Sequence, residues 1–182
     1  MSVVEECYII RRADGFEFCH PKLGFVWLKQ AIPGGSLKDR WSAMTVRIVR
    51  VDEGSRLAEA DCPWMEAYVI VVRRPARSAL ENMMGEAGEF LDLDCGREAL
   101  WLFNCTTYYD CLEENLSDIV KFKDGRIMYV SEWVLRRSKI GASAIFKIGG
   151  MPWAALFCSQ AFVDSWEQAG LKGLRFDPVQ LA

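Results

Sequence analysis

The sequence predicts an α+β fold with mostly antiparallel strands, a few short helices, and a C-terminal helix followed by a short strand. Apolar residues alternate with polar ones over short segments such as Met44–Val51, as expected for half-buried strands. Asp124-Gly125 and Gly149-Gly150 are turn signals between neighbouring apolar segments. Helices are predicted at Ser78–Met84 and Ser159–Ala169, with one or two further turns over Tyr108–Leu116. Helices and strands therefore do not alternate regularly, and this favours α+β over a parallel α/β fold.

The N-terminal part of the chain is rich in predicted strands. These strands are Cys7–Arg12, Met44–Val51 and Trp64–Arg73. The region Pro21–Trp41 is rich in Gly, Pro and Trp and is predicted to be a loop. Arg74-Pro75 punctuates the chain. We therefore expect a strand-rich region over residues 1–75 and an α+β region over residues 76–182, either separate or as one continuous domain.

The second part begins with a short predicted helix, Ser78–Met84, that ends near Gly85 or Gly88. One or two helical turns are expected over Tyr108–Leu116, which carries several acidic residues. Strands are predicted at Phe90–Leu93, Ala99–Phe103, Arg126–Leu135, Ala144–Ile148 and Ala154–Phe157.

The C-terminal segment predicts a helix followed by a strand. Ser159 is a good N-cap because its hydroxyl can accept a hydrogen bond from a free amide of the first turn. Gly170 is expected to end the helix in a left-handed conformation, and Gly173 to allow a second change of direction. Leu174–Phe176 alternates as a strand does, and Pro178 is expected to end it because proline has no amide proton.

Composition indicates a folded protein without a membrane span. Of the 182 residues, 51% are hydrophobic and 12% are aromatic, which is enough for an ample core. The longest apolar run, Ala67–Val72, has the length of a strand and not of a transmembrane helix. The first residues, MSVVEECYII, have glutamates where a signal peptide has lysines. We therefore expect a cytoplasmic protein with no membrane partner.

The ionisable residues do not form a recognisable catalytic or metal-binding motif. The seven cysteines are scattered, without a C-x-x-C pair, and His20 is the one histidine, so we expect reduced thiols, no metal site and no cofactor. Cys19 and His20 are adjacent in a predicted strand and should point to opposite faces, which disfavours a nucleophile–base pair.

Three further motifs are explained more simply as surface features. Gly34–Lys38 lacks the spacing of a phosphate-binding loop, and Asp92 with Asp94 lacks the further ligands of a metal site. Arg136–Lys139 is basic, but an isoelectric point near 5.3 disfavours a nucleic-acid partner. We therefore expect no enzymatic activity.

Charge is unevenly distributed along the chain. Residues 76–118 contain ten acidic and two basic residues, a net charge of −8, whereas residues 119–150 have a net charge of +5. The acidic stretch is either a docking face for an electropositive partner or an ordinary solvated face.

The C-terminal half resembles a bacterial immunity family. The runs Leu100–Cys105 and Asp110–Glu113, followed by Ser117, are similar to its conserved strand and the acidic motif after it, with Glu113 where the family often has aspartate. Ile145–Ile148, Leu156–Phe162 and the closing Trp166–Phe176 resemble its later motifs. The family is immunity protein family eleven of the polymorphic toxin systems, and the resemblance lies mainly over residues 78–178.

This resemblance implies a protein that binds a cognate secreted toxin and neutralises it. Members of this family are commonly encoded beside secreted toxins that carry nuclease domains of the histidine–metal-finger kind, so the resemblance implies a partner with a basic groove. On that basis we expect the toxin-binding residues to be the carboxylates Asp110, Glu113, Glu114 and Asp118, with Tyr109 as an aromatic anchor. The alternatives are a small cytosolic enzyme and a non-catalytic subunit of a secretion-related complex.

Overall fold

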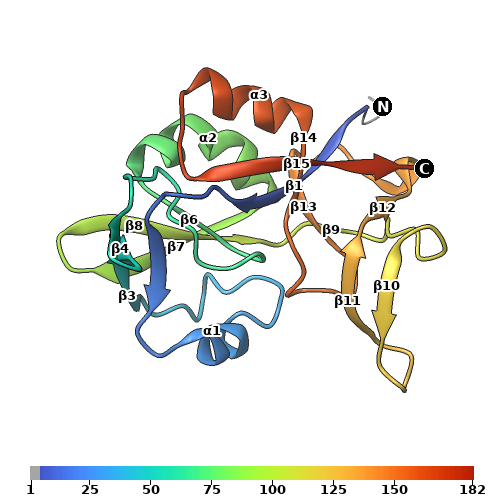
Figure 1. Cartoon of the computed structure of the whole chain (residues 1–182), viewed down its shortest axis with the longest axis horizontal. Helices are drawn as coiled ribbons and strands as arrows, with labels where there is room; N and C mark the ends of the chain where they lie inside the picture. The colour runs from blue at the N-terminus through green and yellow to red at the C-terminus, as the bar shows by residue number, and fades with distance from the viewer. Residues whose placement is uncertain (1–4) are drawn as a thin grey trace.

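Two β-sheets organise the computed structural model, which describes residues 5–182 (Figure 1). The six-stranded sheet has the order β12-β15-β1-β14-β13-β9. Its strands are β1 (Cys7–Arg12), β9 (Tyr108–Tyr109), β12 (Val134–Leu135), β13 (Ile145–Ile148), β14 (Phe157–Ser159) and β15 (Leu174–Leu181). The five-stranded sheet has the order β2-β3-β7-β8-β6. Its strands are β2 (Phe18–Pro21), β3 (Met44–Val49), β6 (Ile70–Val72), β7 (Gly88–Cys95) and β8 (Glu98–Cys105).

Two small hairpins and the helices complete the fold. The hairpins are β4 (Val51–Asp52) with β5 (Ser55–Arg56), and β10 (Asp118–Lys121) with β11 (Ile127–Glu132). The helices are α1 (Phe25–Ala31), α2 (Arg74–Ala87), α3 (Gln160–Gln168) and the 3-10 turn η1 (Arg137–Lys139). Most strand pairs are antiparallel; β3–β7, β12–β15 and β13–β9 are parallel. The predicted α+β class is therefore confirmed. No helix within residues 5–182 is both long and apolar enough to span a membrane.

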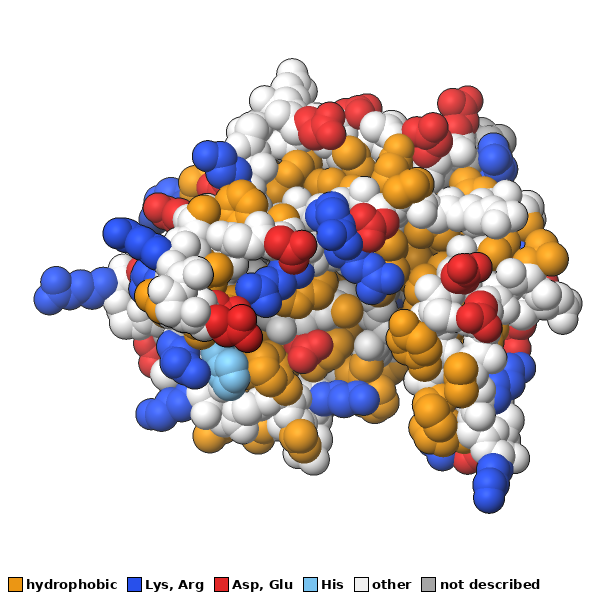
Figure 2. All heavy atoms as spheres, viewed as in Figure 1, with side chains coloured by type: hydrophobic (Ala, Val, Ile, Leu, Met, Phe, Trp, Pro, Cys, Tyr) orange, Lys and Arg blue, Asp and Glu red, His pale blue; other side chains and the backbone are white. Residues whose placement is uncertain are grey.

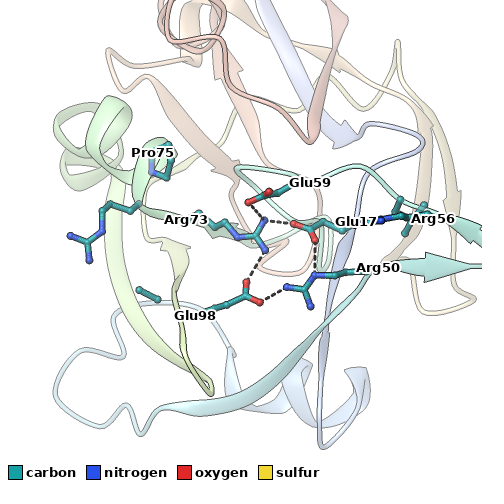
Figure 3. A pocket seen from close by; sticks show the side chains of 10 residues that line it. Glu17, Arg50, Arg56, Glu59, Arg73, Pro75 and Glu98 are labelled. Atoms are coloured by element: carbon teal, nitrogen blue, oxygen red, sulfur yellow. Dashed lines mark hydrogen bonds and ion pairs between the residues drawn. The ribbon is translucent and has the colours of Figure 1, made fainter.

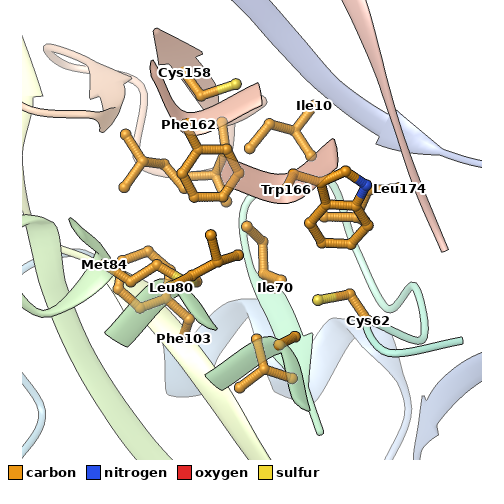
Figure 4. Packing of buried hydrophobic residues seen from close by; sticks show 14 of the residues in the cluster. Ile10, Cys62, Ile70, Leu80, Met84, Phe103, Cys158, Phe162, Trp166 and Leu174 are labelled. Atoms are coloured by element: carbon orange, nitrogen blue, oxygen red, sulfur yellow. The ribbon is translucent and has the colours of Figure 1, made fainter. Parts of the chain in front are cut away.

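The largest hydrophobic cluster joins the two sheets through α2 and α3 (Figure 4). Leu80 and Met84 of α2 and Phe162 and Trp166 of α3 pack with residues of both sheets, Phe103 of β8 among them. Burial of such side chains contributes roughly 1.5 to 3 kcal/mol each. This cluster therefore holds the sheets and helices together.

The outer faces of the sheets are covered by different elements. On the five-stranded sheet, Leu28 of α1 packs in a second cluster with strand residues such as Leu91 and Leu102. On the six-stranded sheet, a third cluster contains Phe146 and Phe157 and is partly covered by residues of the β10–β11 hairpin. Figure 1 accordingly shows α1 and the hairpin projecting on the same side of the molecule, apart from α2 and α3.

Strands from both parts of the chain share the two sheets. β1 pairs with β14 and β15 from the C-terminal part, and β3 pairs with β7. Residues 5–75 and 76–182 therefore build these sheets together.

Several predicted boundaries are wrong, chiefly near proline and glycine. Arg74-Pro75 begins α2, because proline fits the first helical turn, so the helix starts before Ser78. It includes Gly85 and ends at Ala87, with Gly88, the other predicted end, as its C-cap. Phe25–Ala31 is helix α1 and not loop. In Trp64–Arg73 only Ile70–Val72 is a strand.

The terminal unit has the predicted order, with two local differences. Ser159 is the N-cap of α3, but its hydroxyl caps no amide. Gly170 and Gly173 have φ of 64° and 110°, as predicted. Pro178 does not end the strand: β15 continues to Leu181, and at Pro178 it is paired with β1 alone, because β12 pairs only with Gln180 and Leu181.

Candidate functional site

The predicted acidic segment lies at the edge of the six-stranded sheet and leads into the β10–β11 hairpin. Helical turns were expected over Tyr108–Leu116, and this is wrong: the segment begins as strand β9, and Leu112 forms a bridge with Leu135. β9 pairs with β13 through Tyr108 opposite Lys147. Pairing with β13 and with Leu135 therefore gives Tyr108–Leu116 an extended structure in place of the expected helical turns.

The four predicted carboxylates differ in their surroundings. The side chain of Asp110 is 94% exposed and lies 3.9 Å from the guanidinium of Arg136. Glu114 lies 2.6 Å from the Nζ of Lys121, and both side chains are about half exposed. Asp118 accepts a hydrogen bond from the hydroxyl of Ser131 at the base of the hairpin.

Glu113 has a structural role through its backbone. Its amide donates to the carbonyl oxygen of Val134, and its carbonyl oxygen accepts from the hydroxyl of Ser117 at 2.8 Å. Its carboxylate is half-buried and accepts a long hydrogen bond of 3.4 Å from the amide of Asn115. Three of the four carboxylates therefore have a neighbour that pairs with them. Asp110 has Arg136, Glu114 has Lys121, and Asp118 has Ser131.

Tyr109 is held by contacts within the protein. Its ring centroid lies 5.1 Å from that of Phe146, and its hydroxyl accepts a hydrogen bond of 3.1 Å from the amide of Ser143. The side chain is half-buried, so only part of it faces solvent.

The acidic stretch 76–118 does not form a single surface. Glu89 accepts hydrogen bonds from Ser36, the amide of Leu37 and Asn104. Burial alone would raise the pKa of Glu89, but these hydrogen bonds lower it overall. Glu98 is bound by Arg50 and Arg73. Glu89 and Glu98 are therefore bound to groups of this chain and are not available to a partner protein.

A feature that the sequence analysis missed is the apolar surface of the β10–β11 hairpin. Ten large hydrophobic residues are exposed among residues 5–182, and five of them lie on or next to this hairpin: Leu116, Val120, Phe122, Met128 and Tyr129. Val120 and Tyr129 are opposite each other across the two strands, whereas the neighbouring pair Ile119 and Val130 faces the core. In the sequence, Ile119-Val120-Lys121 indicates a strand only weakly. It does not indicate that the hairpin is apolar on its outer face as well as on the face toward the core.

Four of the remaining exposed residues lie around α1. They are Leu23, Val26, Trp27 and Trp153. The indole Nε1 of Trp153 donates to the carbonyl oxygens of Lys29 and Ile32, which fixes Trp153 against the end of α1. Figure 2 shows a notch between the surface over α1 and the hairpin, with hydrophobic side chains on the hairpin beside it.

An open pocket of about 480 Å³ lies elsewhere, at the N-terminus of α2 (Figure 3). Four side chains in it form a ring of alternating charge: Glu17, Arg73, Glu98 and Arg50. Glu17 is 3% exposed, and it also accepts a hydrogen bond from the amide of Ala60. Because each charge is paired within the ring, the simplest role of these residues is to join chain segments.

The cysteines and the histidine lie in separate environments. The thiol of Cys19 is buried, and burial raises its pKa, whereas His20 has its Nδ1 3.0 Å from the carbonyl oxygen of Pro21. Burial raises the pKa of Cys105 and of Cys111 to about 11. Thiols with these pKa values are protonated and weakly nucleophilic at neutral pH. Within residues 5–182 no three His, Cys, Asp or Glu side chains are grouped as metal ligands.

Comparison with known proteins identifies the family. The model of the immunity protein family Imm11 matches residues 5–181. The match extends the resemblance from the C-terminal half to nearly the whole chain, including β1, β2 and β3. No curated protein matches the chain. The family indicates an immunity role, which is the neutralisation of a toxin. This chain therefore belongs to the Imm11 immunity protein family.

Proposed function

We propose that this protein neutralises a cognate secreted toxin by direct, tight association in the cytoplasm, without catalysis. The observation that carries the proposal is membership of the Imm11 immunity protein family over residues 5–181. Buried thiols with raised pKa values support a non-catalytic role.

The toxin is proposed to be a nuclease of the histidine–metal-finger kind. This identification comes from the family resemblance, and the exposed carboxylates of the segment 110–118 are compatible with it. Nucleases bind phosphates through basic grooves, and an acidic surface on an inhibitor attracts such a groove and speeds the encounter.

The toxin-binding residues are proposed to be Asp110, Glu114 and Asp118, supported by Glu113 and Tyr109. Asp110 is the most exposed of the carboxylates. Glu114 is held by Lys121, and an exposed ion pair of this kind contributes only about 0 to 1 kcal/mol. Glu114 can therefore exchange Lys121 for a basic group of the toxin at little cost. Tyr109, with its hydroxyl on Ser143, is proposed to contact the toxin through its exposed edge.

The proposal predicts that a neighbouring reading frame encodes a large secreted protein, and the C-terminal domain of that protein is used for the test. We expect this domain to bind the immunity protein and its nuclease activity to be lost in the complex. Asp110→Lys combined with Glu114→Lys should slow association by about tenfold at low salt and much less at high salt, because exposed charges act mainly on the association rate.

Asp164→Lys combined with Glu167→Lys is the matched control, since both are exposed carboxylates on α3, far from the hairpin in Figure 1. Equal association rates for the Asp110→Lys, Glu114→Lys variant and the control would exclude the acidic segment as the docking site. Absence of binding by the unmodified protein would instead contradict the proposed partner.

A further inference from the structure

Nine of the ten large hydrophobic residues exposed among residues 5–182 belong to two surfaces. We call the segment Glu113–Glu132, with β10 and β11, the arm. We call Lys22–Arg40 together with Trp153 the α1 surface. Figure 2 shows the notch between them. Exposed apolar groups gathered in this way mark an interaction surface rather than scattered solvent contacts.

The outer face of the arm is apolar and exposed to solvent. Its inner face packs on the third hydrophobic cluster through Ile119 and Ile127. Its outer face presents Val120 and Tyr129, which are 48% and 61% exposed. The arm is also a separate two-stranded sheet, paired with neither large sheet. A two-stranded sheet of this kind is only marginally stable by itself, so burial of the outer face would stabilise it.

The α1 surface has the matching apolar character and the opposite charge. Val26 is 77% exposed and Trp27 is 36% exposed. The segment Lys22–Arg40 contains four basic residues and one acidic residue, whereas the arm contains five acidic and three basic residues. The charges of the two surfaces are therefore complementary as well as their apolar faces.

We propose that two copies of this chain form a symmetric dimer in which the arm of each copy packs on the α1 surface of the other. A two-fold axis makes this contact reciprocal, so one symmetric arrangement covers both apolar surfaces of both copies. Figure 2 shows that the notch leaves the two surfaces apart within one chain, so a second copy can approach either surface. This inference requires no toxin, but the arm includes Glu113, Glu114 and Asp118, so the dimer contact and the proposed toxin contact share this segment.

The experiment measures the molar mass of the full chain by sedimentation equilibrium and light scattering from about 1 µM to about 200 µM, a range that covers the affinity of a modest interface. We expect a dimer that dissociates on dilution. Val26→Asp and Tyr129→Asp should each raise the dissociation constant by more than about tenfold, because each places a carboxylate in a contact that occurs twice. Val51→Asp is the matched control: Val51 is 58% exposed and lies outside both surfaces.

Mixing the two variants distinguishes the reciprocal contact from other dimers. In a mixed pair, the intact arm of the Val26→Asp copy meets the intact α1 surface of the Tyr129→Asp copy, so one of the two contacts is restored. The other contact carries both substitutions, and the second substitution in an already disrupted contact costs less than the first. We therefore expect the mixture to dimerise more tightly than either variant alone. A dimer through arms alone would leave Val26→Asp unaffected and would overturn the proposal.

A monomer at every concentration would also overturn the proposal. If the monomeric Tyr129→Asp variant then lost binding of the toxin domain, the arm would be assigned to the toxin instead. Circular dichroism and thermal unfolding of each variant verify the fold. Should Tyr129→Asp unfold, Tyr129→Gln removes the ring without adding a charge and gives the same reading of the dimer.

Discussion

At the scale of single residues, Lys147 is a buried charge without a hydrogen-bond partner among residues 5–182. The side chain is fully buried, and its Nζ lies 5.9 Å and 6.0 Å from the ring centroids of Tyr108 and Tyr68. Burial lowers the pKa of Lys147 from 10.5 to about 8. In the unfolded chain the amine keeps its ordinary pKa, so folding is opposed below about pH 8 and this opposition fades as the pH rises to about 10.5.

We expect Lys147→Met to stabilise the protein at pH 7 by up to about 3 kcal/mol, which is the free energy that corresponds to this pKa difference. The gain should shrink between pH 8 and pH 10.5. Urea unfolding of both proteins across this range measures it. The difference between them cancels the titration of the tyrosines and cysteines other than Cys105, whose pKa Lys147 lowers. A gain that stayed constant with pH would show that packing, not charge, is responsible.

Two glycines of the terminal unit separate the cost of a left-handed backbone from the cost of a steric clash. A Cβ on Gly170, with φ of 64°, meets nothing within 4 Å, whereas a Cβ on Gly173, with φ of 110°, lies 2.6 Å from the carbonyl oxygen of Cys62. Gly170→Ala should therefore cost about 1 kcal/mol from the left-handed backbone alone, and Gly173→Ala clearly more. Thermal unfolding of the two variants tests the order; equal losses would mean that the chain near Cys62 yields freely.

At the scale of elements, α3 and β15 depend on contacts with the N-terminal strand. β15 pairs with all six residues of β1, and Trp166 of α3 packs in the main cluster. Truncation before Trp166 should consequently abolish cooperative unfolding, because it uncovers β1 and removes an aromatic side chain from the core. Circular dichroism melts of the truncated chain measure this, and a melt at the parent temperature would contradict it.

The same elements show what local sequence determines. Cys7–Arg12 and the order helix, glycine, strand at the C-terminus follow from alternation and capping, and the structure has them. The segment Tyr108–Leu116 was misassigned because its structure depends on pairing with β13 and β12, which are distant in sequence. Pro178 was predicted to end the strand because proline has no amide proton. The strand continues because β12 pairs only with Gln180 and Leu181, so no partner strand on that side requires an amide at Pro178.

In the candidate site as well, some features follow from local sequence and others depend on contacts between distant segments. The positions of Asp110 and Glu114 on the surface were expected from their polarity, and the structure has them exposed. The pairing of Glu98 with Arg50 and Arg73 was not predictable, because these residues meet only through the sheet. The exposed face of the arm was also missed, since an apolar residue in a strand is ordinarily assigned to the core.

At the scale of the whole molecule, the ring of Glu17, Arg73, Glu98 and Arg50 joins segments that are distant in sequence. Glu17 precedes β2, Arg50 follows β3, Arg73 is the N-cap of α2, and Glu98 begins β8. Burial alone would raise the pKa of Glu98, but hydrogen bonds from Arg73 and Arg50 lower it below 4.5 overall. Its ionised form therefore stabilises the fold above the unfolded pKa, and this contribution is lost as the pH falls through the lowered folded pKa.

We expect Glu98→Gln to be less stable than the parent chain at pH 7 and to lose less stability on acidification, because the carboxylate responsible for part of the pH dependence is gone. Glu167→Gln is the control, as an exposed carboxylate without an ion pair among residues 5–182. Urea unfolding at pH 7 and at about pH 4 measures both differences. If Glu98→Gln and Glu167→Gln showed the same acid dependence, the ring would not contribute ionisation-linked stability, and Arg73 would have to be held mainly by Glu17 and the carbonyl oxygen of Ala60.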